Sequence, residues 1–340
     1  MAKNFDPVGF LEAVYDLSSS EQAWLNGLAT AALNCLDDGF GVLAYSLCFK
    51  EQTNNPVTAV VIGGDLDLHL SLLERMVPEL RDEQAKKLFG RLAFSLASEH
   101  SLLSDFHQDP TFRHHAHPHG IYDFLGLSAP DPTGSVVVIG ACQAAVRAVD
   151  APRRALWLQL GVHVAAAYRL RYATAHEALN LTQSDIVLSA DGQLVRSGAV
   201  APTPSAMKAL RMAAVAIDHA RGQLRTSAPM EAVDIWKALV TARWSLLDSF
   251  DADGRRYYVA RQNCHEVPTL ETLSRREHEV VQLVALGYGN KLAGYALGLA
   301  PSTVATHLHR AMTKLGVTKR IELIHLIQAL SLFSPANTET

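Results

Sequence analysis

The chain has 340 residues, of which 49% are hydrophobic and 19% are charged. This composition excludes a wholly disordered chain, and the length allows about two or three domains of roughly 100–200 residues each. The start of the chain has no long apolar stretch, and the uncharged segment 155–168 is too short to span a bilayer. We therefore expect a cytoplasmic protein without membrane contact.

The cysteines form no C-x-x-C pair, so we expect reduced thiols rather than a disulfide framework or a zinc module. The four are Cys35, Cys48, Cys142 and Cys264.

The net charge of −4 hides a division along the chain. Residues 270–330 carry seven Lys or Arg against four acidic residues, which leaves 23 basic against 30 acidic residues elsewhere. A mildly basic C-terminal region on an acidic body indicates an anionic partner that is held at one end of the protein.

The first 180 residues predict helices combined with strand pairs. Apolar runs at 41–49 and 57–63 flank a turn-rich segment, as in a hairpin. Helical spacing then extends from Leu66 to Ser98 with a break near Pro78. The other expected elements are helices within 1–38 and at 152–180 and strands at 120–128 and 134–142. This order predicts an α+β domain over residues 1–180, with helices packed on an antiparallel sheet. His163, on the long helix, fits a hydrogen-bonded core histidine.

A second, smaller α+β unit is expected over residues 184–263. Asp253-Gly254 lies between two β-rich segments, 244–250 and 255–261, and is a strong hairpin signal. A strand at 186–189 and helices at 205–221 and 230–241 precede this hairpin. Residues 264–269, which include Pro268, read as a linker. We find no internal repeat in the sequence.

The element order of residues 1–180 resembles that of GAF and PAS sensor domains. The turn Asp131-Pro-Thr-Gly134 before an apolar strand and the closing helix with Tyr168-Arg-Leu-Arg171 add to the resemblance. It implies a GAF-like sensory and dimerisation domain at 1–180 and a PAS-like unit at 184–263.

From Leu273 onward the pattern changes to short helices separated by glycines, which predicts an all-α domain over residues 270–332. Ser274 and Glu277 fit a capping box at the start of the first helix, and Gly287 ends it. The four expected helices lie at 275–286, 290–297, 301–315 and 320–330. The short connection between the second and third is helix-turn-helix spacing.

The third helix has two faces. Val304, Leu308, Ala311 and Leu315 form an apolar stripe. The polar residues fall on the other side, where they could meet phosphates and base edges: Thr303, Thr306, His307, Arg310 and Lys314.

Residues 273–320 closely resemble the LuxR/FixJ-type helix-turn-helix family. The matching positions are Leu273-Ser-Arg-Arg-Glu277, Val280, Leu283, Ala285, Gly287, Asn290-Lys291, Leu297, Leu299, Thr303-Val304, His307, Lys314-Leu-Gly-Val317 and Arg320. The resemblance implies that the helix at 301–315 enters the major groove of double-stranded DNA, with Lys291 and Lys314 near the backbone. The DNA-binding residues are then Lys291, Ser302, Thr303, Ala305, Thr306, His307, His309, Arg310 and Lys314.

The same resemblance implies that the last helix pairs with a second protomer through Ile321, Ile324 and Ile327. A homodimer on two half-sites would follow.

Some positions depart from the family pattern. Ala305 replaces the usual lysine, which predicts modest affinity and a base-facing set of Ala305, Thr306 and His309. Ala300 replaces the usual serine N-cap, a loss of roughly 1 kcal/mol that Pro301 partly offsets. Gly294 replaces an alanine inside the second helix, at a cost of roughly another 1 kcal/mol.

A histidine-rich segment separates the two halves of the first domain. It contains His107, His114, His115, His117 and His119. Neutral imidazoles suit zinc, copper or nickel, but the spacing matches no standard metal motif. We read a polar loop, with a pH-responsive or ligand-facing loop and a metal site as the alternatives.

The sequence thus predicts a DNA-binding transcriptional regulator and not an enzyme, since neither Gly-x-x-x-x-Gly-Lys nor Gly-x-Ser-x-Gly is present. The N-terminal region would sense a small-molecule ligand or a partner, RNA polymerase is a further candidate partner of the protein, and no cofactor can be named. Two alternatives remain. One is a metal sensor or metal-dependent enzyme built on His107–His119, and the other is an adaptor whose C-terminal bundle binds protein.

Overall fold

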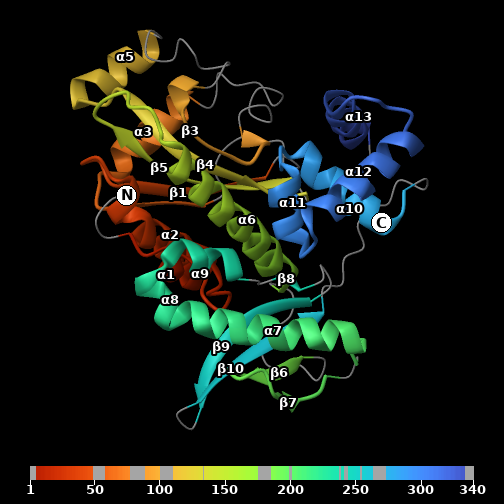
Figure 1. Cartoon of the computed structure of the whole chain (residues 1–340). Coiled ribbons are helices and arrows are strands. Elements are labelled where there is room, and N and C mark those ends of the chain that lie inside the picture. Colours follow the sequence, from red (N-terminus) through yellow and green to blue (C-terminus); the bar gives the residue numbers. More distant parts are fainter. Residues whose placement is uncertain are drawn as a thin grey trace, which may run out of the picture. The chain divides into compact units, whose positions relative to one another are not determined.

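The computed structural model describes residues 5–48, 58–76, 89–99, 110–132, 134–174, 185–198, 201–236, 239–240, 244–252, 255–262 and 273–333. The chain divides into two compact units, Met1–Asn263 and Cys264–Thr340 (Figure 1). The expected linker, 264–269, lies outside the described residues. Among the helices of the described ranges, none is long and apolar enough to cross a membrane.

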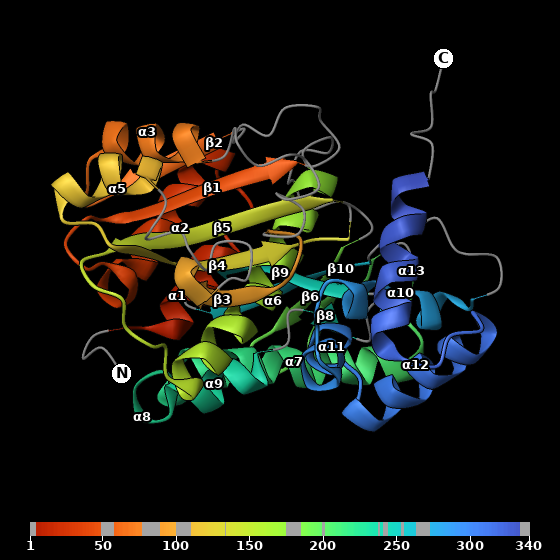
Figure 2. The same ribbon diagram turned by 90° about the horizontal axis from the view of Figure 1, so that it is seen from above.

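The first unit begins with an antiparallel sheet in the order β2-β1-β5-β4-β3. Its strands are β1 (Val42–Cys48), β2 (Thr58–Ile62), β3 (Ala93–Leu96), β4 (Asp123–Pro130) and β5 (Ser135–Gln143). Figure 2 shows β1, β5 and β4 side by side. The expected hairpin of β1 and β2 is confirmed, and so are the strands expected near 120–128 and 134–142.

Helices cover both faces of this sheet. On one face lie α1 (Pro7–Val14), α2 (Glu21–Leu36) and α6 (Ala151–Thr174). Helix α6 approaches closely because Gly161 has no side chain: a Cβ there would lie 2.7 Å from Leu92 Cδ1 and 2.8 Å from Leu127 Cδ1.

The core beneath α6 is aromatic. The Trp157 ring is fully buried and stacks on Phe94, with ring centroids 5.2 Å apart, and on Phe5 at 5.4 Å. His163 is buried on the same helix, with its Nδ1 2.8 Å from the Tyr15 hydroxyl. The expected core histidine is therefore confirmed. Burial lowers the pKa of His163 to about 3, so the ring is neutral at physiological pH.

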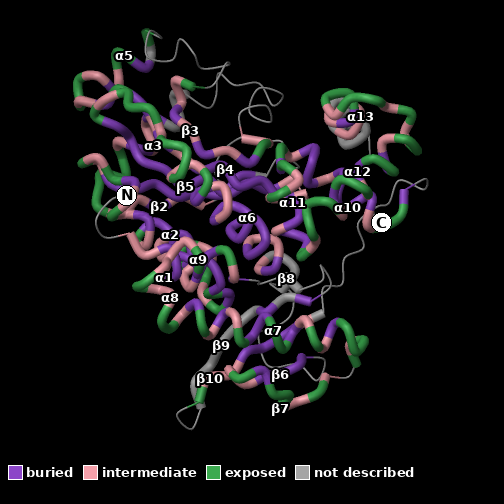
Figure 3. The backbone as a smooth tube through the Cα atoms, viewed as in Figure 1, coloured by how far each residue is buried: buried purple, intermediate pink, exposed green. Residues whose placement is uncertain are grey.

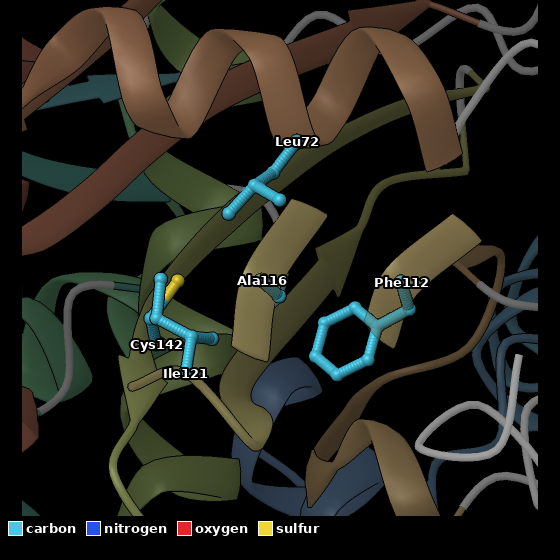
Figure 4. Packing of buried hydrophobic residues seen from close by; sticks show 5 residues of the cluster. All are labelled: Leu72, Phe112, Ala116, Ile121 and Cys142. Atoms are coloured by element: carbon cyan, nitrogen blue, oxygen red, sulfur yellow. The ribbon is translucent and has the colours of Figure 1, made fainter. Parts of the chain in front are cut away.

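On the opposite face, α3 (Leu66–Met76) and α5 (Pro110–Ala116) pack against the sheet. Figure 4 shows this cluster at close range. Its buried members are Leu72, Phe112, Ala116, Ile121 and Cys142.

Two expectations for this region are wrong. The helical pattern from Leu66 to Ser98 contains strand β3, because Phe94 and Leu96 alternate with smaller residues and pair with β4. The described part of the histidine-rich segment, residues 110–119, is not a loop: Pro110 starts α5, and His117–His119 form a 3-10 turn that ends at Gly120.

The rest of the first unit is built on a second antiparallel sheet, in the order β7-β6-β10-β9-β8. Its elements are β6 (Ile186–Ser189), β7 (Leu194–Arg196), α7 (Pro204–Arg221), α8 (Gln223–Ser227), α9 (Pro229–Ile235), β8 (Leu239–Val240), β9 (Trp244–Ala252) and β10 (Arg255–Gln262). The expected β9–β10 hairpin is confirmed. The helix expected at 230–241 instead ends at Ile235, because Leu239 and Val240 pair with the start of β9.

The two sheets share one topology. Counted in chain order within each sheet, the strands run 2-1-5-4-3 in both cases. The strand order therefore repeats although the sequence shows no repeat.

Polar contacts join the two sheets' helices. Arg225 Nε donates to Asp6 Oδ2 at 2.8 Å, and its Nη1 donates to Glu12 Oε2 at 3.1 Å. Gln159 on α6 donates to Asp234 on α9 at 2.8 Å. These bonds link α1 and α6 to the second sheet's helices.

The second unit is helical. It contains α10 (Arg275–Ala285), α11 (Asn290–Leu297), α12 (Pro301–Lys314) and α13 (Arg320–Phe333). These bounds agree with the expected helices to within three residues at each end.

Candidate nucleic-acid interface

Helix α10 begins at the capping box expected from the sequence. Ser274 Oγ accepts from the backbone N–H of Glu277 at 3.3 Å, and Glu277 Oε2 accepts from the N–H of Ser274 at 2.8 Å. Lys314, at the end of α12, donates to the same carboxylate oxygen at 2.6 Å. Its ammonium, together with the Ser274 amide, lowers the pKa of Glu277 to about 2.

Glycines end the first three helices in one way. Gly287, Gly298 and Gly316 all have positive φ. In each case the residue after the glycine donates its N–H to a carbonyl in the last turn of the helix, as in Tyr288 to Leu283 at 3.0 Å.

The connection between α11 and α12 is tight because Gly294 lies beneath it. A Cβ at Gly294 would lie 2.6 Å from the carbonyl oxygen of Leu299. The Leu299 N–H donates to the Gly294 carbonyl at 2.8 Å. The glycine that looks like a helix weakness in the sequence is therefore what lets the two helices approach.

Helix α12 has the two faces that the sequence predicts. Val304, Leu308 and Ala311 are buried against α10 and α11, and Leu315 is half-buried. The exposed residues on the other face are Ser302, Ala305, Thr306, His309 and Arg310, while Thr303 and His307 are half-buried.

The start of α12 has no side-chain cap. Ala300 is the N-cap residue and offers no oxygen to the first amides, and Pro301 occupies the first helical position. The expected loss of the cap is confirmed.

The positive charges differ in their pairing. Arg275 and Arg276 pair with Glu279, and Lys314 pairs with the buried Glu277. Within the described part of this unit, Lys291, Arg310 and Lys319 have no carboxylate partner. Lys314 thus has a structural partner that the sequence does not reveal, although 43% of its side chain is exposed.

Arg320 links the start of α13 to the turn between α10 and α11, a role that the sequence does not predict. Its Nη1 donates to Asn290 Oδ1 at 3.0 Å, and its Nη2 donates to the carbonyl of the buried Tyr288. The start of α13 is thereby fixed to the α10–α11 turn. Its position in the family motif was the only signal for it.

Helix α13 packs on α10 through Leu323, which is fully buried. Of the residues expected at a dimer contact, Ile321 is 48% exposed, whereas Ile324 and Ile327 are half-buried.

The histidine-rich segment lies in the first unit, apart from this surface in the sequence. His107 is outside the described residues. The His114 and His115 rings lie edge to face, and His117 contacts Phe112 and Tyr122. Among the described residues, no three His, Cys, Asp or Glu side chains are placed to hold a metal ion.

Comparison with known proteins identifies the helical unit. Residues 271–327 match the model of the family of bacterial regulatory proteins of the luxR type. The oxygen regulatory protein NreC of Staphylococcus aureus, strains JH9 and JH1, is 44% identical over 52 residues. This match spans 15% of the chain and about a quarter, 24%, of the relative's length.

Among solved structures, Escherichia coli SdiA aligns over 97% of this chain and 98% of that chain, with 9% identity and a TM-score of 0.32. SdiA in complex with octanoyl-rac-glycerol aligns over 96% of this chain and 91% of that chain, with 10% identity and a TM-score of 0.25. Scores this low do not establish a common fold. The family assignment therefore rests on the helical unit alone: residues 271–327 form a helix-turn-helix domain of the luxR family of bacterial regulatory proteins.

Proposed function

We propose that the chain is a dimeric, sequence-specific regulator of transcription that places α12 in the major groove of DNA. The exposed face of α12 carries this proposal. Arg310 on this face and Lys291 on α11 pair with no carboxylate of the described residues and would contact phosphates, whereas Ala305, Thr306 and His309 would face the bases. Ser302, Thr303 and His307 lie at the edges of the same face. Lys314 pairs with Glu277 and, with 43% of its side chain exposed, would also contact the DNA backbone.

The first turn of α12 supports a phosphate contact. Ala300 has no side-chain oxygen, so the backbone N–H groups in the first turn of α12 receive no hydrogen-bond acceptor from the N-cap position. These N–H groups carry the positive end of the helix dipole. A phosphate would supply the missing acceptor. The absence of the family's lysine at Ala305 leaves few cations, so we expect moderate affinity that depends steeply on Arg310.

The N-terminal unit is proposed as the sensory part, with a GAF-like domain at 1–180 and a PAS-like domain at 184–263. The shared strand order of the two sheets supports this division. A ligand, or contact with RNA polymerase, would act by changing the spacing of the two DNA-binding domains in the homodimer.

The test is selection from randomised duplexes by the full chain, followed by fluorescence anisotropy on the selected site over a range of salt. A two-fold symmetric site is expected. Arg310→Ala should weaken binding and reduce the slope of log K against log salt by about 0.9, the loss of one phosphate contact. Arg113→Ala removes an exposed cation of the N-terminal unit and is the matched control. Unchanged affinity and slope in Arg310→Ala would contradict the proposed orientation of α12.

A further inference from the structure

Exposed apolar side chains gather on the second sheet of the N-terminal unit. Of the large apolar residues that the described ranges leave exposed, four lie on β7 and α7: Leu194, Val195, Met212 and Val215. Met212 is 64% exposed and Val195 is 56% exposed. The β6–β7 turn touches the helix, because a Cβ at Gly192 would lie 2.9 Å from the Arg211 carbonyl oxygen and 3.1 Å from Val215 Cγ2. The turn that leads into β7 therefore lies against α7 at Arg211 and Val215.

Helix α7 does not need Met212 and Val215 for its own packing. Its buried residues face the sheet: Ala206, Leu210, Ala213, Ala214, Ile217 and Ala220. Met212 and Val215 are three residues apart, in the middle of the opposite face. Figure 3 shows buried and exposed stretches alternating along α7. An apolar centre on the solvent face of an amphipathic helix is a candidate contact surface.

One pair of charges on the flank of this face, Arg211 and Asp218, is self-complementary in one orientation. Arg211 and Asp218 are seven residues apart, which places them on the same flank of α7, two turns and about 10 Å from each other. Arg211 is exposed, and the Asp218 side chain is 38% exposed although its carboxylate accepts from the Tyr258 hydroxyl and lies 3.8 Å from Arg256. A two-fold axis perpendicular to two antiparallel α7 helices brings the Arg211 flank of one copy to the Asp218 flank of the other. A parallel pair would oppose like charges.

We propose that α7 is a dimer surface, on which a second copy of this chain packs its own α7 in antiparallel orientation. Met212 of one copy then covers Val215 of the other, and two Arg211–Asp218 ion pairs flank this centre. The inference rests on the dimer of the proposed function, and it names a contact outside the DNA-binding domain.

The first test is the oligomeric state of the full chain without DNA, measured by sedimentation at several protein concentrations. Met212→Glu should raise the dissociation constant of the dimer at least about tenfold, because it places a carboxylate in the apolar centre. Val146 is an exposed apolar residue outside α7, at 52% exposure, and Val146→Glu should leave the dimer intact. Circular dichroism of each variant checks the fold.

The second test uses charge exchange. Arg211→Glu and Asp218→Arg should each weaken the dimer, because each creates two like-charge pairs. An equimolar mixture should restore it, since both pairs are complementary in the mixed dimer. A parallel or unrelated interface does not predict this rescue.

The inference is overturned if the unmodified chain is monomeric at every concentration, or if it forms a dimer that Met212→Glu leaves intact. In the second case the dimer of the proposed function survives with another interface, such as α13. If dimerisation depends on Met212 but no duplex is selected, the α7 surface stands and DNA recognition fails.

Discussion

Replacing Lys314 with methionine should destabilise the helix-turn-helix domain more than it weakens contacts with phosphate. The ammonium lies 2.6 Å from Glu277 Oε2, and the Glu277 side chain is 5% exposed. Its pKa of about 2, against an ordinary 4.5, corresponds to about 3 kcal/mol if the pair were fully shielded from water. Solvent screens an ammonium with 43% exposure, and Ser274 contributes to the shift, so we expect a loss of about 1–2 kcal/mol.

The pH dependence has a definite sign. Because the folded domain lowers the pKa of Glu277, the stabilisation is present above the ordinary pKa of a glutamate. It is lost as the pH falls from about 4.5 to about 2. The difference between the Lys314→Met variant and the unmodified protein should therefore be largest at neutral pH and should shrink in acid.

Hydrogen exchange of peptides from α10 and α12 in the full chain is the suitable assay. All four tryptophans lie in the first unit, so intrinsic fluorescence does not report on these helices. Protected amides of α10 and α12 should exchange about tenfold faster in Lys314→Met at neutral pH. Glu277→Gln completes a double-mutant cycle, which should show coupling between the two residues.

Arg310→Met is the matched control. It should leave exchange unchanged and lower the salt slope of DNA binding by about 0.9. The structural role of Lys314 would be refuted if Lys314→Met left exchange unaltered and reduced the salt slope as much as Arg310→Met.

Three further outcomes can be measured. Gly294→Ala should destabilise the C-terminal helices, because the new Cβ would press on the Leu299 carbonyl, and this cost should exceed the roughly 1 kcal/mol gained from better helix propensity. Peptides from α11 and α12 should then exchange their amide hydrogens faster. Slower exchange in the variant would contradict this prediction. The first unit should lose stability as the pH falls from about 6.5 toward about 3, because the His163 ring takes up a proton in the unfolded chain but stays neutral in the folded one. Urea unfolding followed by tryptophan fluorescence should show that the stability of His163→Gln depends less on pH. An equal pH dependence in the variant would argue against this role of His163. Arg169→Met should lower the free energy of unfolding by about 3 kcal/mol in the same assay, because the Asp131 carboxylate is 1% exposed and loses the guanidinium 3.1 Å away. If the urea midpoint changes no more than it does for a substitution at an exposed residue, the ion pair is dispensable.

The sequence alone determined the features that depend on near neighbours. Ser274 and Glu277 are three residues apart, and the helix between Ser274 and Gly287 is bounded by caps that any reader of the chain can locate. The hairpin around Asp253-Gly254 and the two faces of α12 follow in the same way from turn chemistry and from a repeat of 3.6 residues. The helix-turn-helix domain can therefore be predicted from the sequence alone.

Tertiary structure decided what depends on distant partners. Strand β3 forms because Phe94 pairs with Leu127 on β4. The sequence pattern of these residues, taken without that partner, predicts the continuation of a helix. Lys314 reads as a DNA contact until the fold brings it to Glu277, 37 residues earlier. The repeated strand order of the two sheets is likewise invisible in the sequence, because many different apolar residues can fill the same pattern of pairing and burial.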